Sequence, residues 1–331
     1  MHINLFIYGC GHHRAAWRHP DSSVEQLGDI RYYENLARIA ERGKLDAVFF
    51  ADGSSVDSVE DGPRWFLEPL TCLAALSRAT ERIELGTAVL QTYPCHPLLQ
   101  ANRAVAAANG MGRPGLTLGV GPSHRPVIEG MFGMSYDHPG RNTEEYLRIL
   151  APLLRGEAVD VAGEDWTAHG AMAPVEQPVP LLLAALGPRL LRVAGELADG
   201  VVLWLAPPRA IETHVVPRLH RAAETAGRPR PRVVAGLPVA VHDDLDEARA
   251  ATAETATRYE HLPNYQRILE RGEVESAVGA AVLGDEASVA RQLQGLLDAG
   301  ATDIQAFIVP CGDDRRGSVR RPRELLASLT G

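Results

Sequence analysis

The stretch RIELGTAVLQTY, from Arg82 to Tyr93, predicts a central buried strand. Its apolar and β-branched side chains are typical of a strand that is covered on both faces. Gly86 and Thr87 add little bulk near its middle, so another group can approach the backbone closely there. The stretch therefore suggests the floor of a ligand site, and an ordinary core strand is the alternative interpretation.

Further apolar runs of strand length alternate with helical patterns along the chain. The runs cover residues 3–8, 47–50, 116–120, 181–184, 200–203, 232–241 and 303–308, and two excursions, 156–180 and 245–271, interrupt the alternation. Eight strands, each followed by a helix, predict a (β/α)8 TIM barrel with insertions, an α/β fold forming one domain over residues 1–331. A doubly wound sheet would accept the same alternation, but no GxGxxG motif follows the first strand.

The composition narrows the classes of protein to which the chain can belong. Hydrophobic residues make up 45% of the 331 residues and charged residues 23%, a balance typical of a globular enzyme. The formal charge of -9 argues against nucleic acid or an anionic membrane as a partner. The arginines near the C-terminus, between Arg315 and Arg323, are interpreted as a solvated edge. Four cysteines without paired spacing and the absence of a basic, apolar leader favour a cytoplasmic protein.

The loop after the first strand is the most informative one. It reads GHHRAAWRHPDS and contains His12, His13, Trp17 and Arg18. In a barrel, functional residues lie at the carboxyl ends of the strands. A Trp can stack on a planar ring, and an Arg or a protonated His can stabilise a developing anion. His12 and His13 are adjacent and lack a carboxylate motif, so no metal site is predicted.

A phosphate site is predicted between the strand at 181–184 and the following helix. The helix begins at Pro188, so its free backbone N–H groups and its dipole can hold an anion beside Gly187. Arg189 would add a charge-assisted contact. A structural strand-to-helix turn is the alternative interpretation.

Several motifs resemble one superfamily. The segments GHHRAAWRHPDS, LARIAERGKLDAVFFADG and LEPLTCLAAL are similar to the nitrilotriacetate and dibenzothiophene-sulfone monooxygenases of the luciferase-like superfamily. From Gly86 onward, QTYPCHP, LGVGPSHRPVIEGMFGMSYDHPGR, LAALGPRLLRVAGELADG and RVVAGLPVAVHDD resemble the actinobacterial branch that uses the deazaflavin coenzyme F-420. Together these segments extend over most of the chain.

This resemblance implies a luciferase-like barrel with a non-prolyl cis peptide at Ala88-Val89 under the flavin ring. It implies reduced FMN delivered by a separate flavin reductase, or F-420 as the alternative, together with a small organic substrate. A homodimer is expected because superfamily members often pair through helices of the early barrel. The residues predicted to bind the cofactor are Asp52, Thr87, Ala88, Val89, Gly121, Ser123, Tyr136, Gly187, Pro188 and Arg189. The residues predicted to be catalytic are His12, His13, Trp17, Arg18 and His124.

Two enzymatic hypotheses follow, with a flavin-binding barrel that lacks activity as a third. The first is a monooxygenase that uses reduced FMN and dioxygen, because the monooxygenase-like N-terminal third supplies the residues expected over the reacting ring. The second is hydride transfer with F-420, which the longer C-terminal resemblance favours. In the deazaflavin relatives a His follows the Asp at the end of strand two, where this chain has Gly53, and one dehydrogenase relative has Glu at the position of His124. These departures weaken an assignment as a simple sugar-phosphate or alcohol dehydrogenase, and the first hypothesis is preferred on the N-terminal resemblance.

Overall fold

The computed structural model describes residues 1–7, 28–52, 67–172 and 175–330. Parallel strands close into a barrel, because the last barrel strand pairs with the first. Around the barrel the eight strands are β1 (His2–Ile7), β2 (Ala47–Phe50), β3 (Glu84–Thr87), β5 (Leu116–Gly121), β8 (Leu181–Ala184), β9 (Gly200–Trp204), β10 (Arg232–Val241) and β12 (Asp303–Ile308). The predicted TIM barrel is confirmed, and its eight strands lie where the apolar runs placed them, except that the run from Arg82 to Tyr93 is divided.

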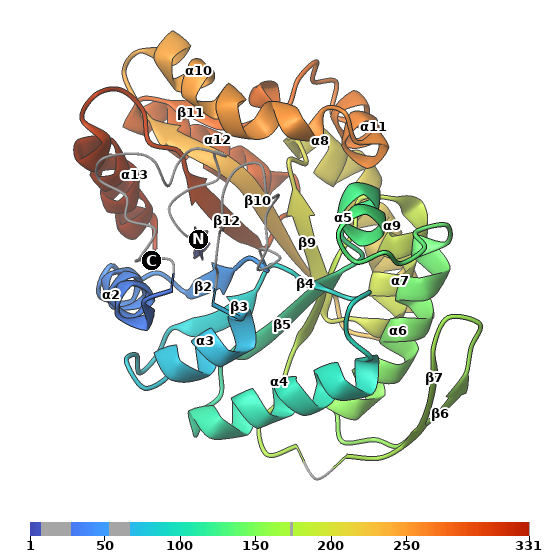
Figure 1. Ribbon diagram of the computed structural model, residues 1–331. Helices are drawn as coiled ribbons and strands as arrows, with labels where there is room; N and C mark the ends of the chain where they lie inside the picture. The colour runs from blue at the N-terminus through green and yellow to red at the C-terminus, as the bar shows by residue number, and fades with distance from the viewer. Residues whose placement is uncertain (8–27, 53–66, 173–174, 331) are drawn as a thin grey trace.

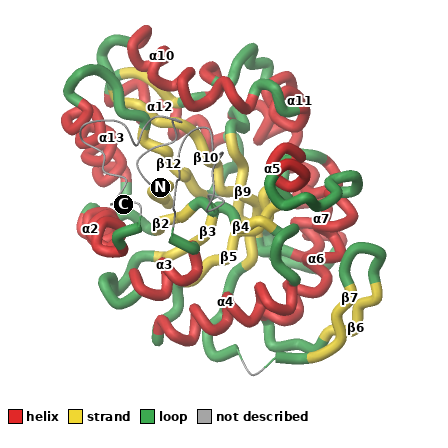
Figure 2. Tube along the Cα trace, in the orientation of Figure 1, coloured by secondary structure: helices red, strands yellow, loops and turns green. Residues whose placement is uncertain are grey.

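Helices surround the strands, as Figures 1 and 2 show. The long ones are α2 (Ile30–Arg42), α3 (Pro69–Leu76), α4 (Pro97–Met111), α6 (Pro139–Leu154), α7 (Pro188–Leu197), α9 (Val216–Thr225), α12 (Glu286–Asp298) and α13 (Arg315–Leu329). Shorter ones are α5 (Arg125–Gly130) and α8 (Pro208–Ala210). Within the described ranges, none of these helices combines the length and the apolar character needed to span a membrane.

The strand predicted from Arg82 to Tyr93 is divided in two. It ends as β3 at Thr87 and resumes as β4 (Leu90–Gln91), which still pairs with β5. The peptide Ala88-Val89 between them is cis, as the resemblance implied. The prediction of a single continuous strand is wrong, because this connection leaves the ladder between its two halves.

The two excursions differ in structure. Residues 245–271 are helical, as predicted, and form α10 (Leu245–Ala256), a 3₁₀ turn (Thr257–Tyr259) and α11 (Pro263–Arg271). The first excursion contains an antiparallel hairpin of β6 (Val159–Ala162) and β7 (Thr167–Gly170), which the sequence analysis did not predict. A further short strand, β11 (Val282–Gly284), pairs with the last three residues of β10, Val239 to Val241. Each of these strands has three or four residues, too few for a clear periodicity.

The C-terminal arginines lie on α13, where the side chain of Arg320 is 74% exposed and Arg321 forms ion pairs at the surface. Its guanidinium lies 2.8 Å from a carboxylate oxygen of Glu286 and 2.9 Å from one of Asp243. Arg321 therefore joins the last helix to the start of α12 and to the segment after β10. Sequence spacing could not show this, because the partners lie 35 and 78 residues away.

Charged residues close the amino end of the barrel. His2, Glu84, Arg232 and Asp303 each begin a strand, and Arg232 lies 2.6 Å from Asp303 and 2.9 Å from Glu84. The side chain of Asp303 is only 3% exposed and also lies 2.5 Å from His2. Burial acts to raise the pKa of Asp303, but the contacts with His2 and Arg232 outweigh it and hold that pKa well below its usual range. This cluster stabilises the base of the barrel and leaves the opposite end for function.

We expect Arg232→Met to lower the free energy of unfolding by about 3 kcal/mol, because it leaves the Asp303 carboxylate buried without its main partner. Urea denaturation followed by circular dichroism measures the change. Arg249→Met is the matched control, since Arg249 pairs with Asp246 at the surface, where such a pair contributes about 1 kcal/mol or less.

The loss should also depend on pH. A carboxyl whose pKa is lowered in the folded state stabilises the fold at any pH above its pKa in the unfolded chain, about 3.9. This stabilisation is lost progressively as the pH falls below that value. The difference between the wild type and Arg232→Met should therefore shrink below about pH 4. A difference that stays constant down to pH 3 would contradict this explanation.

Candidate functional site at the carboxyl end of the barrel

Thr87, the last residue of β3, ties this strand to β5. Its hydroxyl donates to the carbonyl oxygen of Gly119 at 2.8 Å and accepts from the N–H of Gly119 at 2.9 Å. A Cβ on Gly119 would lie 2.1 Å from the carbonyl oxygen of Thr87, so no larger residue fits there. The pair sets the position at which the chain leaves β3 for the Ala88-Val89 peptide.

On the other side of β3, strand β2 and the residues after it form hydrogen bonds with the Ala88-Val89 connection and with β4. The N–H of Ala88 donates to the carbonyl oxygen of Phe50 at 2.8 Å, and the N–H of Gln91 donates to the carboxylate of Asp52 at 3.3 Å. Burial raises the pKa of Asp52, and the charge of Glu68 adds to this effect, while the bond from Gln91 opposes it. Asp52 is thus a partly buried carboxyl at the rim, beside Ala88 and Val89.

The barrel mouth is asymmetric. On β1, β9 and β12, the rings of Phe6, Trp204 and Phe307 form a cluster whose centroids lie 6.0 to 6.1 Å apart. On the other side the residues are small: Ala88 and Val89 between β3 and β4, Gly121 at the end of β5 and Ala184 at the end of β8. A Cβ on Gly121 would lie 2.8 Å from the Cβ of Ala184 and 2.9 Å from a methyl of Val89, so these groups pack closely into a low surface. We call these four residues the small-residue shelf.

His124 follows β5 and begins α5. Its ring lies 5.9 Å from Tyr265 and 6.5 Å from Tyr259, and Tyr259 in turn lies 6.0 Å from Trp204. The second excursion therefore brings two tyrosines against the mouth. Burial lowers the pKa of His124, and the charge of Arg258 lowers it further, so the imidazole is neutral near pH 7 and can accept a proton.

Tyr136 packs against the connection between β5 and α5. Its hydroxyl donates to the carbonyl oxygen of Ser123 at 2.7 Å, and its ring lies 5.3 Å from the buried ring of Tyr93. Burial raises the pKa of Tyr136 far above its usual value, so the phenol remains a neutral donor. Ser123 itself has a positive φ of 62°, a conformation that is uncommon for residues other than glycine. Tyr136 thus helps to hold this loop beside His124.

The N-terminus of α7 is open. Gly187 is the N-cap, and among the described residues no side chain caps the helix. A Cβ on Gly187 would find no atom of the described structure within 4 Å. Pro188 occupies the first helical position, where its missing N–H costs nothing. The following N–H groups are those that a helix leaves unpaired, and they suit an anion.

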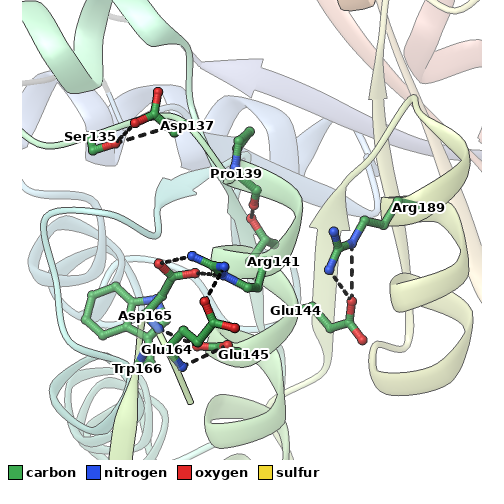
Figure 3. A network of polar contacts seen from close by, with 11 residues as sticks. Ser135, Asp137, Pro139, Arg141, Glu144, Glu145, Glu164, Asp165, Trp166 and Arg189 are labelled. Carbon is green, nitrogen blue, oxygen red and sulfur yellow. Dashed lines mark hydrogen bonds and ion pairs between the residues drawn. The ribbon is translucent and has the colours of Figure 1, made fainter.

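Arg189, which was predicted to contact the anion, and Arg141 on α6 are both paired with carboxylates, as Figure 3 shows. Arg189 donates to Glu144 on α6 at 3.0 and 3.3 Å. Arg141 donates to Asp165 at 2.8 Å, in the turn of the hairpin. A phosphate would have to compete with Glu144 for Arg189, so that contact stays a prediction.

The structure thus brings together Asp52, Thr87, Ala88, Val89, Gly121, Ser123 and His124 at one rim, with Gly187 and Pro188 at the next strand end. His12, His13, Trp17 and Arg18 lie outside the described residues. Sequence reasoning missed Tyr259 and Tyr265, because their helical excursion carried no motif that placed it over the mouth. In the parts of the chain that are described, no group of three or more His, Cys, Asp or Glu side chains could hold a metal ion.

Residues 6–303 match the model of the luciferase-like monooxygenase family. The chain belongs to this family. An uncharacterized protein of Mycobacterium bovis is 31% identical over 222 residues, a match that covers 62% of this chain but only 64% of that relative. The 5,10-methylenetetrahydromethanopterin reductase of Methanolobus tindarius is 27% identical over 252 residues, covering 76% of this chain and 73% of the relative.

Solved structures of the family share the fold. An EDTA monooxygenase from Chelativorans sp. BNC1 has a TM-score of 0.76 at 17% identity, covering 99% of this chain and 93% of its own. A coenzyme F420-dependent tetrahydromethanopterin reductase from Methanopyrus kandleri has a TM-score of 0.68 at 19% identity, covering 91% of this chain and 95% of its own. At these sequence identities, the structural similarity supports the luciferase-like barrel fold but does not identify the cofactor.

We expect Gly119→Ala to destabilise the protein by at least about 3 kcal/mol, because the new Cβ would collide with the backbone of Thr87. Thermal unfolding measures the loss. The matched control is Gly187→Ala, whose Cβ meets no described atom and whose φ of -90° suits any residue, so its effect should stay within about 0.5 kcal/mol. An equal loss of stability in the two variants would contradict the close contact between Gly119 on β5 and Thr87 on β3.

We expect the imidazole of His124 to titrate below its ordinary pKa when followed by NMR. Arg258→Met should raise that pKa, because a nearby positive charge is removed, but should not restore the ordinary value, since burial is the larger cause. Arg267→Met, at an exposed position on the neighbouring helix α11, should leave it unchanged. A wild-type pKa at or above the ordinary value would exclude a buried, neutral His124.

Proposed function

We propose that this protein is a monooxygenase that uses reduced FMN and dioxygen to oxygenate a small organic substrate. One observation carries the proposal: the small-residue shelf lies directly beside an open helix N-terminus. Ala184 ends β8 and belongs to the shelf, and Gly187, three residues later, caps α7. A planar ring on the shelf and a phosphate at Gly187 would match the two parts of FMN.

The residues present fit this cofactor. Ala88, Val89 and Gly121 would offer backbone and methyl groups to the face of the ring, with Thr87 and Asp52 holding that segment in place. The backbone N–H groups that follow Gly187 would bind the phosphate, with Pro188 setting the start of the helix. When bound, reduced FMN would supply the electrons that activate dioxygen.

Other residues would serve the substrate side. His124 is neutral and partly buried, so it can take up a proton beside the ring and return it. The cluster of Phe6, Trp204 and Phe307 would keep water from the opposite wall of the mouth. Tyr136 and Ser123 would keep His124 in place through their shared hydrogen bond. His12, His13, Trp17 and Arg18 remain proposed members of the site from the motif alone.

Hydride transfer with coenzyme F-420 is the alternative. A 5,10-methylenetetrahydromethanopterin reductase is similar over 252 residues, and two structural neighbours are named as F420-dependent. A deazaflavin also combines a planar ring with a phosphate, so the shelf by itself does not distinguish it from FMN. We prefer FMN because Gly53 follows Asp52, where the deazaflavin relatives have a His.

The proposal has consequences for partners. Because no second nucleotide motif is visible for a nicotinamide, a separate flavin reductase would deliver the reduced FMN. A homodimer and a cytoplasmic location remain proposals that rest on the resemblance and the composition.

Binding of the reduced cofactor tests the proposal. We expect micromolar affinity for reduced FMN, measured anaerobically by fluorescence, and at least about tenfold weaker binding of reduced F-420, a difference of about 1.4 kcal/mol. With reduced FMN bound, admission of dioxygen should lead to oxygen uptake. Tight binding of F-420 without binding of FMN would overturn the choice, and incorporation of labelled oxygen into a substrate would separate oxygenation from hydride transfer.

A further inference from the structure

His214 is a buried histidine that the site described above does not use. It is 2% exposed and lies in a π-helical turn, Ile211–Val215, between α8 and α9. Its Nε2 lies 2.9 Å from the carbonyl oxygen of Leu186, and its Nδ1 lies 2.8 Å from the guanidinium of Arg271. The side chain therefore joins the strand-to-helix loop after β8 to the end of α11.

These two contacts determine where the proton of His214 lies. A guanidinium can only donate, so Nδ1 must accept from Arg271. Nε2 then carries the hydrogen and donates it to the carbonyl oxygen of Leu186. Burial lowers the pKa of His214 and Arg271 lowers it as well, against the opposing bond to Leu186, which agrees with a neutral ring. His214 thus acts as a donor of fixed orientation.

The donor acts on the peptide that precedes the α7 helix. In a trans peptide the C=O of one residue and the N–H of the next point in opposite directions. Because His214 binds the carbonyl oxygen of Leu186, the N–H of Gly187 points away from His214. Gly187 is the open N-cap described above, with no atom of the described structure near its Cβ position. One buried side chain therefore sets the direction of the first free donor of the proposed phosphate loop.

The surrounding chain brings His214 to this place. A π-helical turn adds a residue to the helix and often occurs at functional sites. On the other side, a Cβ on Gly272 would lie 2.4 Å from Pro207, so only glycine lets the end of α11 pack against the start of α8 and place Arg271 beside His214. Figure 1 shows α11 next to α8 on this side of the barrel.

We infer that His214, oriented by Arg271, is a positioning residue that directs the Leu186–Arg189 loop toward the phosphate of the cofactor. The inference rests on the proposed function, because it takes the phosphate site at Gly187 from it. It adds a residue that touches no cofactor and acts through the backbone of Leu186. It also links the second excursion, through Arg271, to the cofactor side of the mouth.

Comparison of FMN with riboflavin, which lacks the phosphate, tests the inference. We expect the wild type to bind FMN more tightly than riboflavin. His214→Phe should weaken FMN binding by about tenfold and leave riboflavin binding within about twofold, because one donor to a charged group is misdirected. His214→Gln should restore most of the preference, since its amide can donate to Leu186 and accept from Arg271. His220→Phe, on helix α9 directly after the π-helical turn, is the matched control and should change neither affinity.

The outcomes separate the two proposals. Equal weakening of FMN and riboflavin in His214→Phe would show a merely structural role and overturn the inference, while the proposed function stands. A wild type that binds FMN and riboflavin equally, or that binds neither FMN nor F-420, would overturn the phosphate site and the inference with it. If F-420 binds instead, the same comparison uses F-420 and its phosphate-free deazaflavin fragment.

A second variant covers the case in which His214→Phe does not fold. Arg271→Met changes an exposed residue and should still lower the preference for FMN over riboflavin, by about threefold, because His214 loses the contact that fixes its tautomer. An unchanged preference in folded Arg271→Met would contradict the orienting role of Arg271.

Discussion

The hydroxyl of Thr87 both donates to and accepts from the backbone of Gly119, and the geometry of the mouth depends on this pair of bonds. It joins β3 to β5 at the point where β3 leaves the sheet. Because the Cβ of any larger residue at position 119 would strike the backbone of Thr87, the bond and the glycine depend on each other.

The two ends of the barrel use different physical means. At the amino end, Asp303, Arg232 and Glu84 form a buried ionic cluster that stabilises the closed sheet. At the carboxyl end, aromatic rings fill one side, and glycine and alanine line the other. A planar ring needs a low surface on one face and a wall that excludes water, and this division provides both. Residues at one end of the strands therefore stabilise the fold, and residues at the opposite end of the same strands form the proposed binding site.

The excursions connect this mouth to the rest of the molecule. The second one places Tyr259 and Tyr265 against His124 and, through Arg271, contacts the histidine that holds the carbonyl oxygen of Leu186. The first one is attached to α6, where Glu145 accepts hydrogen bonds from three successive backbone N–H groups of the hairpin turn. Helix α6 also carries Glu144, the partner of Arg189. The second excursion thus reaches the loop at the start of α7 through His214, whereas the first is attached to α6, the helix that also pairs with Arg189.

The sequence by itself determined the order and type of the barrel elements, because apolar periodicity and glycine or proline boundaries are local properties of the chain. It also indicated which strand ends carry polar or small residues, and the motifs around Ala88-Val89 implied the cis peptide that the structure contains. Only the tertiary structure decided which of these residues meet. Arg189 pairs with Glu144 across 45 residues, and His214 reaches Leu186 across 28. Such contacts depend on how helices pack around the barrel, and no local pattern encodes them.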